Sequence, residues 1–263
     1  MGLRLAVMMR GRNYLQGILG VILALSIWQI LPYTGLVTPE QIPPASSVLI
    51  RLVQLTSLSD FWLSIAMTVA AAGLGLLIAF ILGVAIGALM GSFRVIYDAL
   101  NPIVEFLRPV PGVALIPVAI LMFGPGVTSD VSLVVFGCIW VLIIQTLYGV
   151  QALDEVALQT ARSFRLNMWD QLRFVQIPSA LPYIATGLRI SSSIALIIAV
   201  TAELIAGNTG LGNSIVLAQS AARPTDMYAY IVTAGLLGIG IHILTTSMEE
   251  RALYWHQSYR TGR

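Results

Sequence analysis

The feature that most constrains the fold of this chain is a run from residue 61 to residue 93 that contains no charged side chain. Such a run exceeds the roughly 20 residues that a helix needs to cross a hydrocarbon core about 30 Å thick. Further apolar runs follow, and only 10% of all residues are charged, against about 25% in an ordinary soluble domain. The sequence therefore predicts an all-α polytopic membrane protein, forming a single transmembrane domain over residues 1–263.

Hydropathy predicts six membrane-spanning helices. We expect them at residues 14–33, 62–91, 102–123, 131–150, 184–206 and 228–247. The third of these spans contains four prolines: Pro102, Pro109, Pro111 and Pro117. Prolines at membrane depth leave backbone carbonyls unpaired, so this span should face protein rather than lipid.

The placement of arginines predicts that both ends of the chain lie in the cytoplasm. With six spans in that orientation, eleven of the fourteen basic residues fall in internal segments; Arg51 and Arg223 fall outside, and Arg108 is assigned to neither side. An excess of basic residues on the inside is typical of membrane proteins. Residues 1–13 resemble the start of a signal peptide, but the apolar run behind them is too long and lacks a small-residue cleavage site. We expect a cytoplasmic tail and a retained first helix.

The residue types exclude several kinds of chemistry. All fourteen basic residues are arginine, whereas a Walker A loop and a Schiff base both need a lysine. We find no His-Glu-x-x-His or Gly-x-Ser-x-Gly motif, and a single cysteine, Cys138, cannot form a disulfide or a cysteine metal cluster within the chain. We therefore expect no enzyme activity, ATPase site, metal, cofactor or nucleic-acid partner in this chain.

Three glycines recur at every fourth residue in the second predicted span: Gly83, Gly87 and Gly91. Small residues at this spacing let two helix backbones approach closely. The partner is either another helix of the same chain or a second subunit.

The connection at residues 151–185, between the fourth and fifth predicted spans, is far longer than a turn, charged and amphipathic. Five large apolar side chains are available to enter a groove on another protein: Phe164, Leu166, Trp169, Leu172 and Phe174. An amphipathic helix commonly binds a partner in this way. We expect this segment to be held by another protein.

This segment resembles the EAA loop of bacterial ABC importer permeases, the binding-protein-dependent transport family of the MetI type. Residues 159–161, Gln-Thr-Ala, stand where Glu-Ala-Ala is usual, Arg165 stands at the glycine, and residues 175–178, Val-Gln-Ile-Pro, match the ending. The resemblance continues through residues 178–189 and includes residues 106–117 and 202–212. These stretches are similar to the branch that imports nitrate, sulfonates, taurine, bicarbonate and thiamine precursors.

The resemblance implies a type I importer permease in the bacterial inner membrane, which forms the pathway for a small anionic or zwitterionic solute. It implies as partners two copies of an ATPase that binds ATP and Mg²⁺, a second permease chain, with a homodimer favoured over a heterodimer, and a periplasmic or lipid-anchored solute-binding protein. A coupling helix in the loop would dock on the ATPase. The coupling residues would be Gln159, Thr160, Ala161, Arg162, Phe164, Arg165, Leu166 and Pro178.

Arg165 departs from the family pattern. Glycine meets a turn of positive φ at no steric cost, whereas an arginine is strained there. Two accounts are open: Asn167, which tolerates that conformation better, takes over the turn, or the loop pairs with an altered ATPase surface.

Three charged residues are candidates for the translocation pathway. Glu203 lies inside an apolar span, where an acid is costly and usually faces a cavity or a partner; a hydrogen-bonded structural acid is the equal alternative. Glu105 and Arg108 are three residues apart and can pair on one helical face, as a structural pair or as part of a cytoplasmic gate.

Two other classes of protein compete with the importer interpretation. A secondary transporter would fit the broken third span, but such carriers often contain internal repeats, and we find none. A non-catalytic structural membrane subunit would leave the long loop unexplained.

Overall fold

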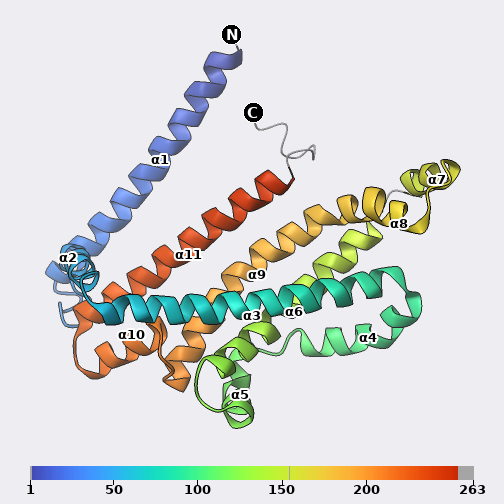
Figure 1. Ribbon diagram of the computed structural model, residues 1–263. Coiled ribbons are helices and arrows are strands. Elements are labelled where there is room, and N and C mark those ends of the chain that lie inside the picture. The colour runs from blue at the N-terminus through green and yellow to red at the C-terminus, as the bar shows by residue number, and fades with distance from the viewer. Residues whose placement is uncertain (1, 154, 254–263) are drawn as a thin grey trace. The chain divides into compact units, whose positions relative to one another are not determined.

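The computed structural model describes residues 2–153 and 155–253. All regular secondary structure over these residues is helical, which confirms the predicted fold class. The helices, in chain order, are α1 (Gly2–Ile30), α2 (Ala45–Leu55), α3 (Ser59–Ser92), α4 (Arg94–Leu107), α5 (Ile116–Phe123), α6 (Val127–Gln151), α7 (Glu155–Ser163), α8 (Met168–Gln171), α9 (Ile177–Ala206), α10 (Leu211–Ser220) and α11 (Pro224–Ala252) (Figure 1). Short 3-10 turns lie at Leu31–Tyr33 and Gly112–Leu115, and a π-helical turn lies at Leu172–Gln176. The contacts divide the chain into two units. The first is Met1–Phe61 with Ile215–Thr233, and the second is Trp62–Ser214 with Ala234–Arg263.

Within the described residues, five helices are long and apolar enough to cross a membrane. A bent pair of helices raises this number to as many as six, in agreement with the prediction. The five candidate spans are Gln16–Tyr33, Ser59–Ser92, Val127–Gln151, Arg173–Ala206 and Pro224–Ala252. The predicted third span, 102–123, is not one straight helix. It consists of Arg94–Leu107 and Gly112–Phe123, bent by 87°. The break contains Pro109 and Pro111, which lack the N–H groups that would continue the helical hydrogen bonds.

Two boundaries differ from those expected. Helix α1 begins at Gly2, so residues 2–13 of the predicted tail continue the first helix. Helix α9 begins at Ile177, so residues 177–185 of the predicted loop belong to that helix. Pro178 stands in its first turn, where a missing N–H costs nothing, and this made the position look like the end of a loop.

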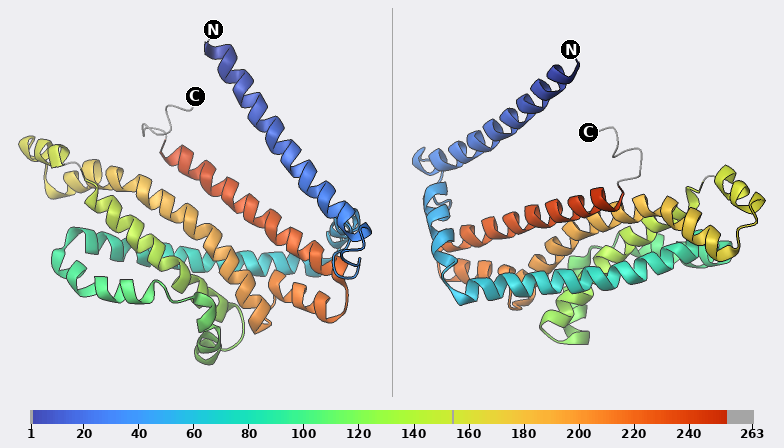
Figure 2. Two further views of the ribbon diagram at one scale, coloured as in Figure 1. Left: turned by 180° about the vertical axis from the view of Figure 1, so that it is seen from behind. Right: turned by 45° about the horizontal axis from the view of Figure 1, so that its top comes forward.

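In the second unit, α6 and α9 lie side by side, and α3 packs against them (Figure 2). Their shared core is built mainly from small residues: Ala71, Ala72, Ala79, Val134, Cys138, Leu142, Ala195 and Ala199. The glycine stripe lies against α6. A Cβ at Gly83 would lie 2.7 Å from Leu142 Cβ, and one at Gly91 would lie 2.7 Å from Val150 Cβ. The stripe therefore serves close packing within the chain.

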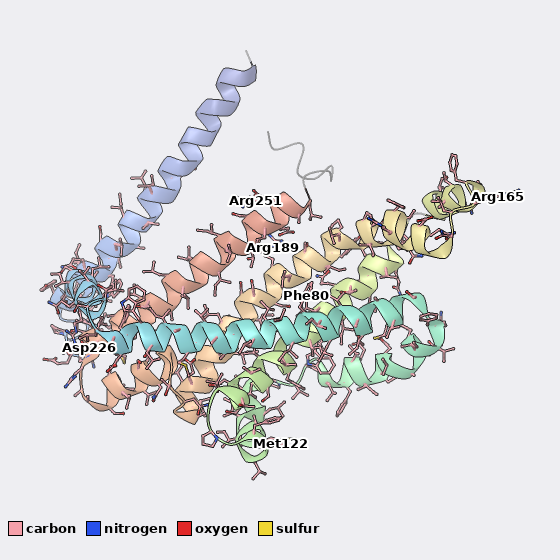
Figure 3. All side chains as sticks on the ribbon, viewed as in Figure 1. Phe80, Met122, Arg165, Arg189, Asp226 and Arg251 are labelled. Carbon is pink, nitrogen blue, oxygen red and sulfur yellow. The ribbon has the colours of Figure 1, made fainter. Side chains whose placement is uncertain are left out.

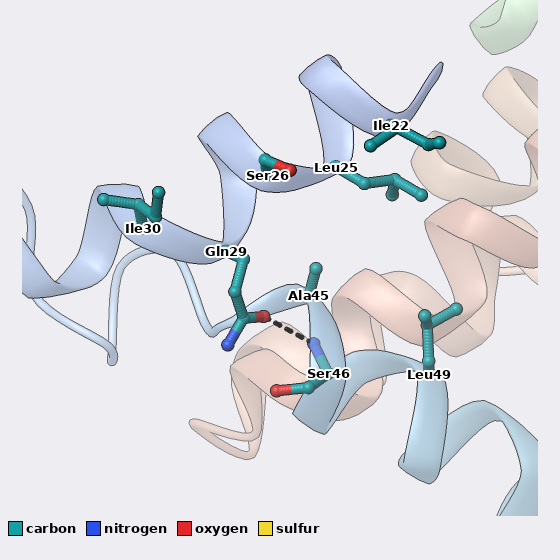
Figure 4. A pocket seen from close by; sticks show the side chains of 8 residues that line it. All are labelled: Ile22, Leu25, Ser26, Gln29, Ile30, Ala45, Ser46 and Leu49. Carbon is teal, nitrogen blue, oxygen red and sulfur yellow. Dashed lines mark hydrogen bonds between the residues drawn. The ribbon is translucent and has the colours of Figure 1, made fainter. Parts of the chain in front are cut away.

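In the first unit, α2 is tied to the start of α11 and to the end of α1. Arg51 pairs with Asp226 at 2.5 Å, and this hydrogen bond raises the pKa of the guanidinium. The indole N–H of Trp28 donates to the carbonyl of Pro43 at 3.1 Å. Figure 4 shows an apolar groove between α1 and α2, where the Ser46 backbone N–H donates to Gln29 Oε1 at 2.9 Å.

Candidate coupling and translocation site

The predicted coupling segment, called the coupling segment below, consists of α7, a turn, α8 and the π-helical turn that leads into α9. Helix α7 ends in a Schellman-type turn, in which the Leu166 N–H donates to the Ala161 carbonyl at 3.1 Å. Arg165 takes the left-handed position of this turn, with φ of +52°. The account in which Asn167 takes over the turn is therefore wrong. The Asn167 side chain instead accepts the Asp170 N–H at 2.9 Å and caps α8.

The predicted coupling residues occupy different environments. Phe164 is 77% exposed, and Gln159, Thr160 and Arg165 are exposed as well. Ala161 is buried, while Leu166 and Pro178 are half-buried. Arg165 lies at the free end of α7 (Figure 3). The side chains of Arg162, Trp169 and Leu172 lie outside the described ones.

A second exposed aromatic group follows on the π-helical turn. Phe174 is 63% exposed, and the guanidinium of Arg173 lies 5.6 Å from its ring centroid, within the range of a cation–π contact. Phe174 was expected to be available to a partner, but Arg173 was not singled out. An arginine next to an aromatic residue in an amphipathic loop was the signal that could have identified it.

The start of α9 is fixed to the end of α11 by a buried acid. Glu249 is only 4% exposed; its Oε2 lies 3.1 Å from Arg189 Nε, and its Oε1 accepts the Thr186 hydroxyl at 3.3 Å. A buried carboxylate needs such partners. These contacts therefore hold α9 and α11 together at this point. No sequence pattern pairs these residues, which are far apart along the chain.

Glu203 is fully buried in a polar cluster formed by α3, α9 and the start of α10. Its Oε2 accepts the Thr68 hydroxyl at 2.9 Å and the Gly212 N–H at 2.9 Å. Gly210 packs directly against the carboxylate, leaving no room for a Cβ. This placement favours the structural interpretation of Glu203 over an open cavity. Thr68 was missed because a threonine within an apolar helix carries no sequence signal of its own.

A second buried acid lies at the start of α6. Asp130 is 1% exposed, and its Oδ1 accepts the Asn208 side-chain N–H at 2.8 Å. Asn208 also donates to the Gly126 carbonyl at 3.1 Å. These bonds join the turn after α9 to the first turn of α6. Neither residue was singled out from the sequence.

Glu105 and Arg108 lie at the end of α4, next to the bend. The expected pairing is confirmed, with Arg108 Nη1 at 3.7 Å from Glu105 Oε1. Both side chains remain more than half exposed, at 57% for Glu105 and 51% for Arg108. Phe106, Leu121 and Met122 are also highly exposed, so the bent pair presents a mixed charged and apolar surface.

Comparisons with known proteins agree with this architecture. The model of a family described as binding-protein-dependent transport system inner membrane component matches residues 75–252. The taurine transport system permease protein TauC of Escherichia coli (strain K12) is 29% identical over 237 residues, which cover 88% of this chain and 86% of that protein. The nitrate import permease protein NrtB of Leptolyngbya laminosa is 31% identical over 193 residues, which cover 73% of this chain and 69% of that protein.

Solved structures share the fold. A chain in the crystal structure of an amino acid ABC transporter with histidines superposes with a TM-score of 0.64 at 22% identity, covering 77% of this chain and 97% of that one. A chain of a bacterial ABC transporter for the import of the acidic polysaccharide alginate also gives a TM-score of 0.64, at 16% identity. The match covers 93% of this chain and 97% of that one. The present chain therefore belongs to the family of binding-protein-dependent transport system inner membrane components, the permease subunits of ABC importers.

Proposed function

We propose that this chain forms, with a second permease chain, the translocation pathway of an importer for a small anionic or zwitterionic solute, and that a separate ATPase drives it. The observation that carries the proposal is the exposed coupling segment, where Phe164 and Phe174 lie on the surface of a membrane protein's loop. Exposed aromatic groups on an ordered loop are typical of a binding surface. ATP and Mg²⁺ would bind the ATPase, and this chain would hold no cofactor and catalyse no reaction.

The coupling residues would act as a unit. Gln159, Thr160, Phe164 and Arg165 would contact the ATPase, Ala161 and Leu166 would hold the turn, and Arg162 would join the contact from α7. Pro178 would start the rigid helix α9, which carries the push into the membrane. Such coupling needs a two-state membrane element that an attached domain biases.

The bent pair α4–α5 supplies the proposed pathway face. An exposed ion pair within a membrane span is costly in lipid, and a helix break at membrane depth must be covered by protein or face water. Both conditions are met if the surface around Glu105 and Arg108 faces the second permease chain and the solute between the two. We favour a homodimer, in which each copy contributes one such face.

The solute class is supported by the names of the relatives. They include permeases named for taurine, aliphatic sulfonates, nitrate and bicarbonate. These solutes are small and carry an anionic oxygen group. Arg108 on the proposed pathway face could bind such a group. Thiamine precursors stay within the proposal by the sequence resemblance alone. Glu203 would contribute indirectly, by fixing α10 at the end of α9.

The proposed assembly takes its solute from a periplasmic or lipid-anchored binding protein and contains two ATPase copies. It would lie in the bacterial inner membrane with both chain termini in the cytoplasm. This orientation places the coupling segment on the side where ATP is available.

Affinity purification in mild detergent tests the proposal. A tagged wild-type chain should co-purify with an ABC ATPase, and a variant with Phe164→Ala and Leu166→Ala should insert into the membrane but lose it. Phe93→Ala removes another exposed aromatic side chain and serves as the control. An ATPase-free chain that still moves sulfonate or nitrate into vesicles would instead identify a secondary carrier.

A further inference from the structure

Arg165 occupies a backbone conformation that does not suit it. Its φ of +52° lies in the left-handed region, where the Cβ of an L-residue crowds the backbone and glycine does not. The turn itself is ordinary, closed by the Leu166 N–H on the Ala161 carbonyl. Nothing in the turn therefore requires an arginine.

The arginine side chain also has no ion-pair partner among the described residues. Arg165 is exposed, and it forms none of the ion pairs found among the described residues, which join Arg51 to Asp226, Arg94 to Asp98, Arg108 to Glu105 and Arg189 to Glu249. A strained residue persists where its position is used. No such use is found in the described part of the chain, and a partner protein could supply it.

The surroundings of Arg165 indicate what it contacts. Phe164 precedes it with an exposed ring, and Arg173 and Phe174 form the second exposed pair of the segment. Arginine and aromatic residues are enriched at the energetic centres of protein interfaces. Among the described residues, Arg165 and Arg173 are the exposed charges that follow Phe164 in this segment, and Asp170 between them is half-buried. An acidic group is the chemical complement of Arg165 itself.

We propose that Arg165 selects the ATPase partner, by pairing with a carboxylate beside the groove that receives Phe164. This inference rests on the proposed function and deepens it: it assigns an acidic group to the ATPase surface at the turn. A guanidinium binds a carboxylate with two parallel hydrogen bonds, which gives direction as well as strength. An ATPase with a neutral residue at that point would bind this permease less well.

Anionic lipid is the competing partner for an exposed arginine beside aromatic rings. Lipid headgroups, however, can meet an arginine from any backbone conformation on the membrane surface. They give no reason to place it at the one position of the turn where it is strained. A fixed acidic partner gives that reason.

The test measures binding of the purified ATPase, the subunit that co-purifies with the wild-type chain, to the permease in discs of neutral lipid. Arg165→Lys keeps the charge but loses the paired hydrogen bonds, so it should bind more weakly than wild type and more tightly than the neutral variants. Arg165→Asn and Arg165→Gly suit the left-handed turn but lack the charge, and they should bind about tenfold more weakly. The affinity of both should also depend less on salt than that of wild type.

Two controls make the result decisive. Limited proteolysis of Arg165→Gly should match wild type, because glycine suits the turn, and Arg94→Gln removes an exposed arginine elsewhere and should bind normally. Unchanged binding of Arg165→Gly, or equal loss in Arg94→Gln, would overturn the inference. So would a loss that occurs only in discs with anionic lipid. If Phe164→Ala releases the ATPase while Arg165→Gly does not, the proposed function stands and the role of Arg165 fails.

Discussion

Thr68 and Glu203 meet at 2.9 Å, although they lie on two different helices, α3 and α9. The same two side chains accept the first N–H groups of a third helix: Thr68 Oγ1 accepts that of Leu211, and Glu203 Oε2 accepts that of Gly212, both at 2.9 Å. The first N–H groups of a helix have no partner within it. Helix α10 is therefore capped by side chains from two other helices, and its start is fixed to both of them.

Replacing Thr68 with valine should loosen this cap. Valine fills the same volume but leaves the buried Leu211 N–H without an acceptor, which costs about 1–3 kcal/mol of folding free energy. Thermal unfolding in detergent would measure this loss of stability. A thiol-reactive dye would follow the unfolding by reporting exposure of the single cysteine, Cys138, which is buried in the fold.

Thr201→Val is the matched control, because the Thr201 hydroxyl bonds to the Ile197 carbonyl of its own helix and to no other described residue. Its midpoint should stay close to that of wild type. An equal midpoint for Thr68→Val would show that α10 does not depend on the cap.

The sequence predicts only part of the site around Glu203, because only some of its residues stand out in the sequence. The isolated charge of Glu203 in an apolar run marks it directly, and its partner Thr68 has no such mark. The contact arises only when α3, α9 and α10 pack together. The contact between Glu249 and Arg189 likewise arises only when α9 and α11 pack together. Local patterns identify a costly residue, and tertiary packing decides what satisfies it.

The boundaries of the helices were also predictable only in part. The prolines at 109 and 111 correctly marked a break, because each removes a backbone donor. Pro178 looked like an end for the same reason, but it stands where α9 begins and needs no donor there. At the α7 turn, propensity favoured Asn167 for positive φ, yet the hydrogen bonds of the turn place Arg165 there. Residue propensities identified candidates for the positive-φ position, but they could not decide which residue of the turn occupies it.

Gly87→Ala should destabilise the contact between α3 and α6. The added Cβ would lie 2.5 Å from the Ile143 carbonyl oxygen and 2.8 Å from Thr146 Cβ, so the two helices must separate. Overpacking of this kind costs about 1–3 kcal/mol. The same thermal assay should show a lower midpoint.

Gly73→Ala on the same helix provides the opposite case. Nothing lies within 4 Å of its added Cβ, and alanine favours a helix over glycine by about 0.5–1 kcal/mol. Its midpoint should hold or rise. A Gly87→Ala protein with normal stability but a weakened dimer would assign the glycine stripe to the subunit interface instead.

Reporter fusions should establish the orientation of the chain. Alkaline phosphatase fused after residue 36 or 126 should be active, and green fluorescent protein fused after residue 160 should fluoresce. The reason is the excess of arginines on the side assigned to the cytoplasm. The two reporters exchanged at each site serve as controls, and a reversed pattern would refute the topology.

Glu249→Ala should weaken the attachment of α9 to α11, because it leaves Arg189 and Thr186 without their carboxylate. Removing one member of a fully buried pair costs about 3–5 kcal/mol. The Arg189 side chain is 38% exposed, so water offsets part of the loss and we expect about 1–3 kcal/mol. Glu250→Ala changes the exposed neighbouring acid and should stay within about 0.5 kcal/mol of wild type in the same assay.

Replacing both partners separates the ion pair from the packing around it. Arg189→Met with Glu249→Met removes both charges while keeping the side-chain volume, and apolar replacement of a buried pair is often neutral or stabilising. The double variant should therefore recover most of the stability that Glu249→Ala loses. If it also binds the ATPase but transports poorly, the charge pair serves the movement of α9 and α11 rather than their stability. If it remains as unstable as Glu249→Ala, hydrogen bonding to Thr186 is what holds the two helices together.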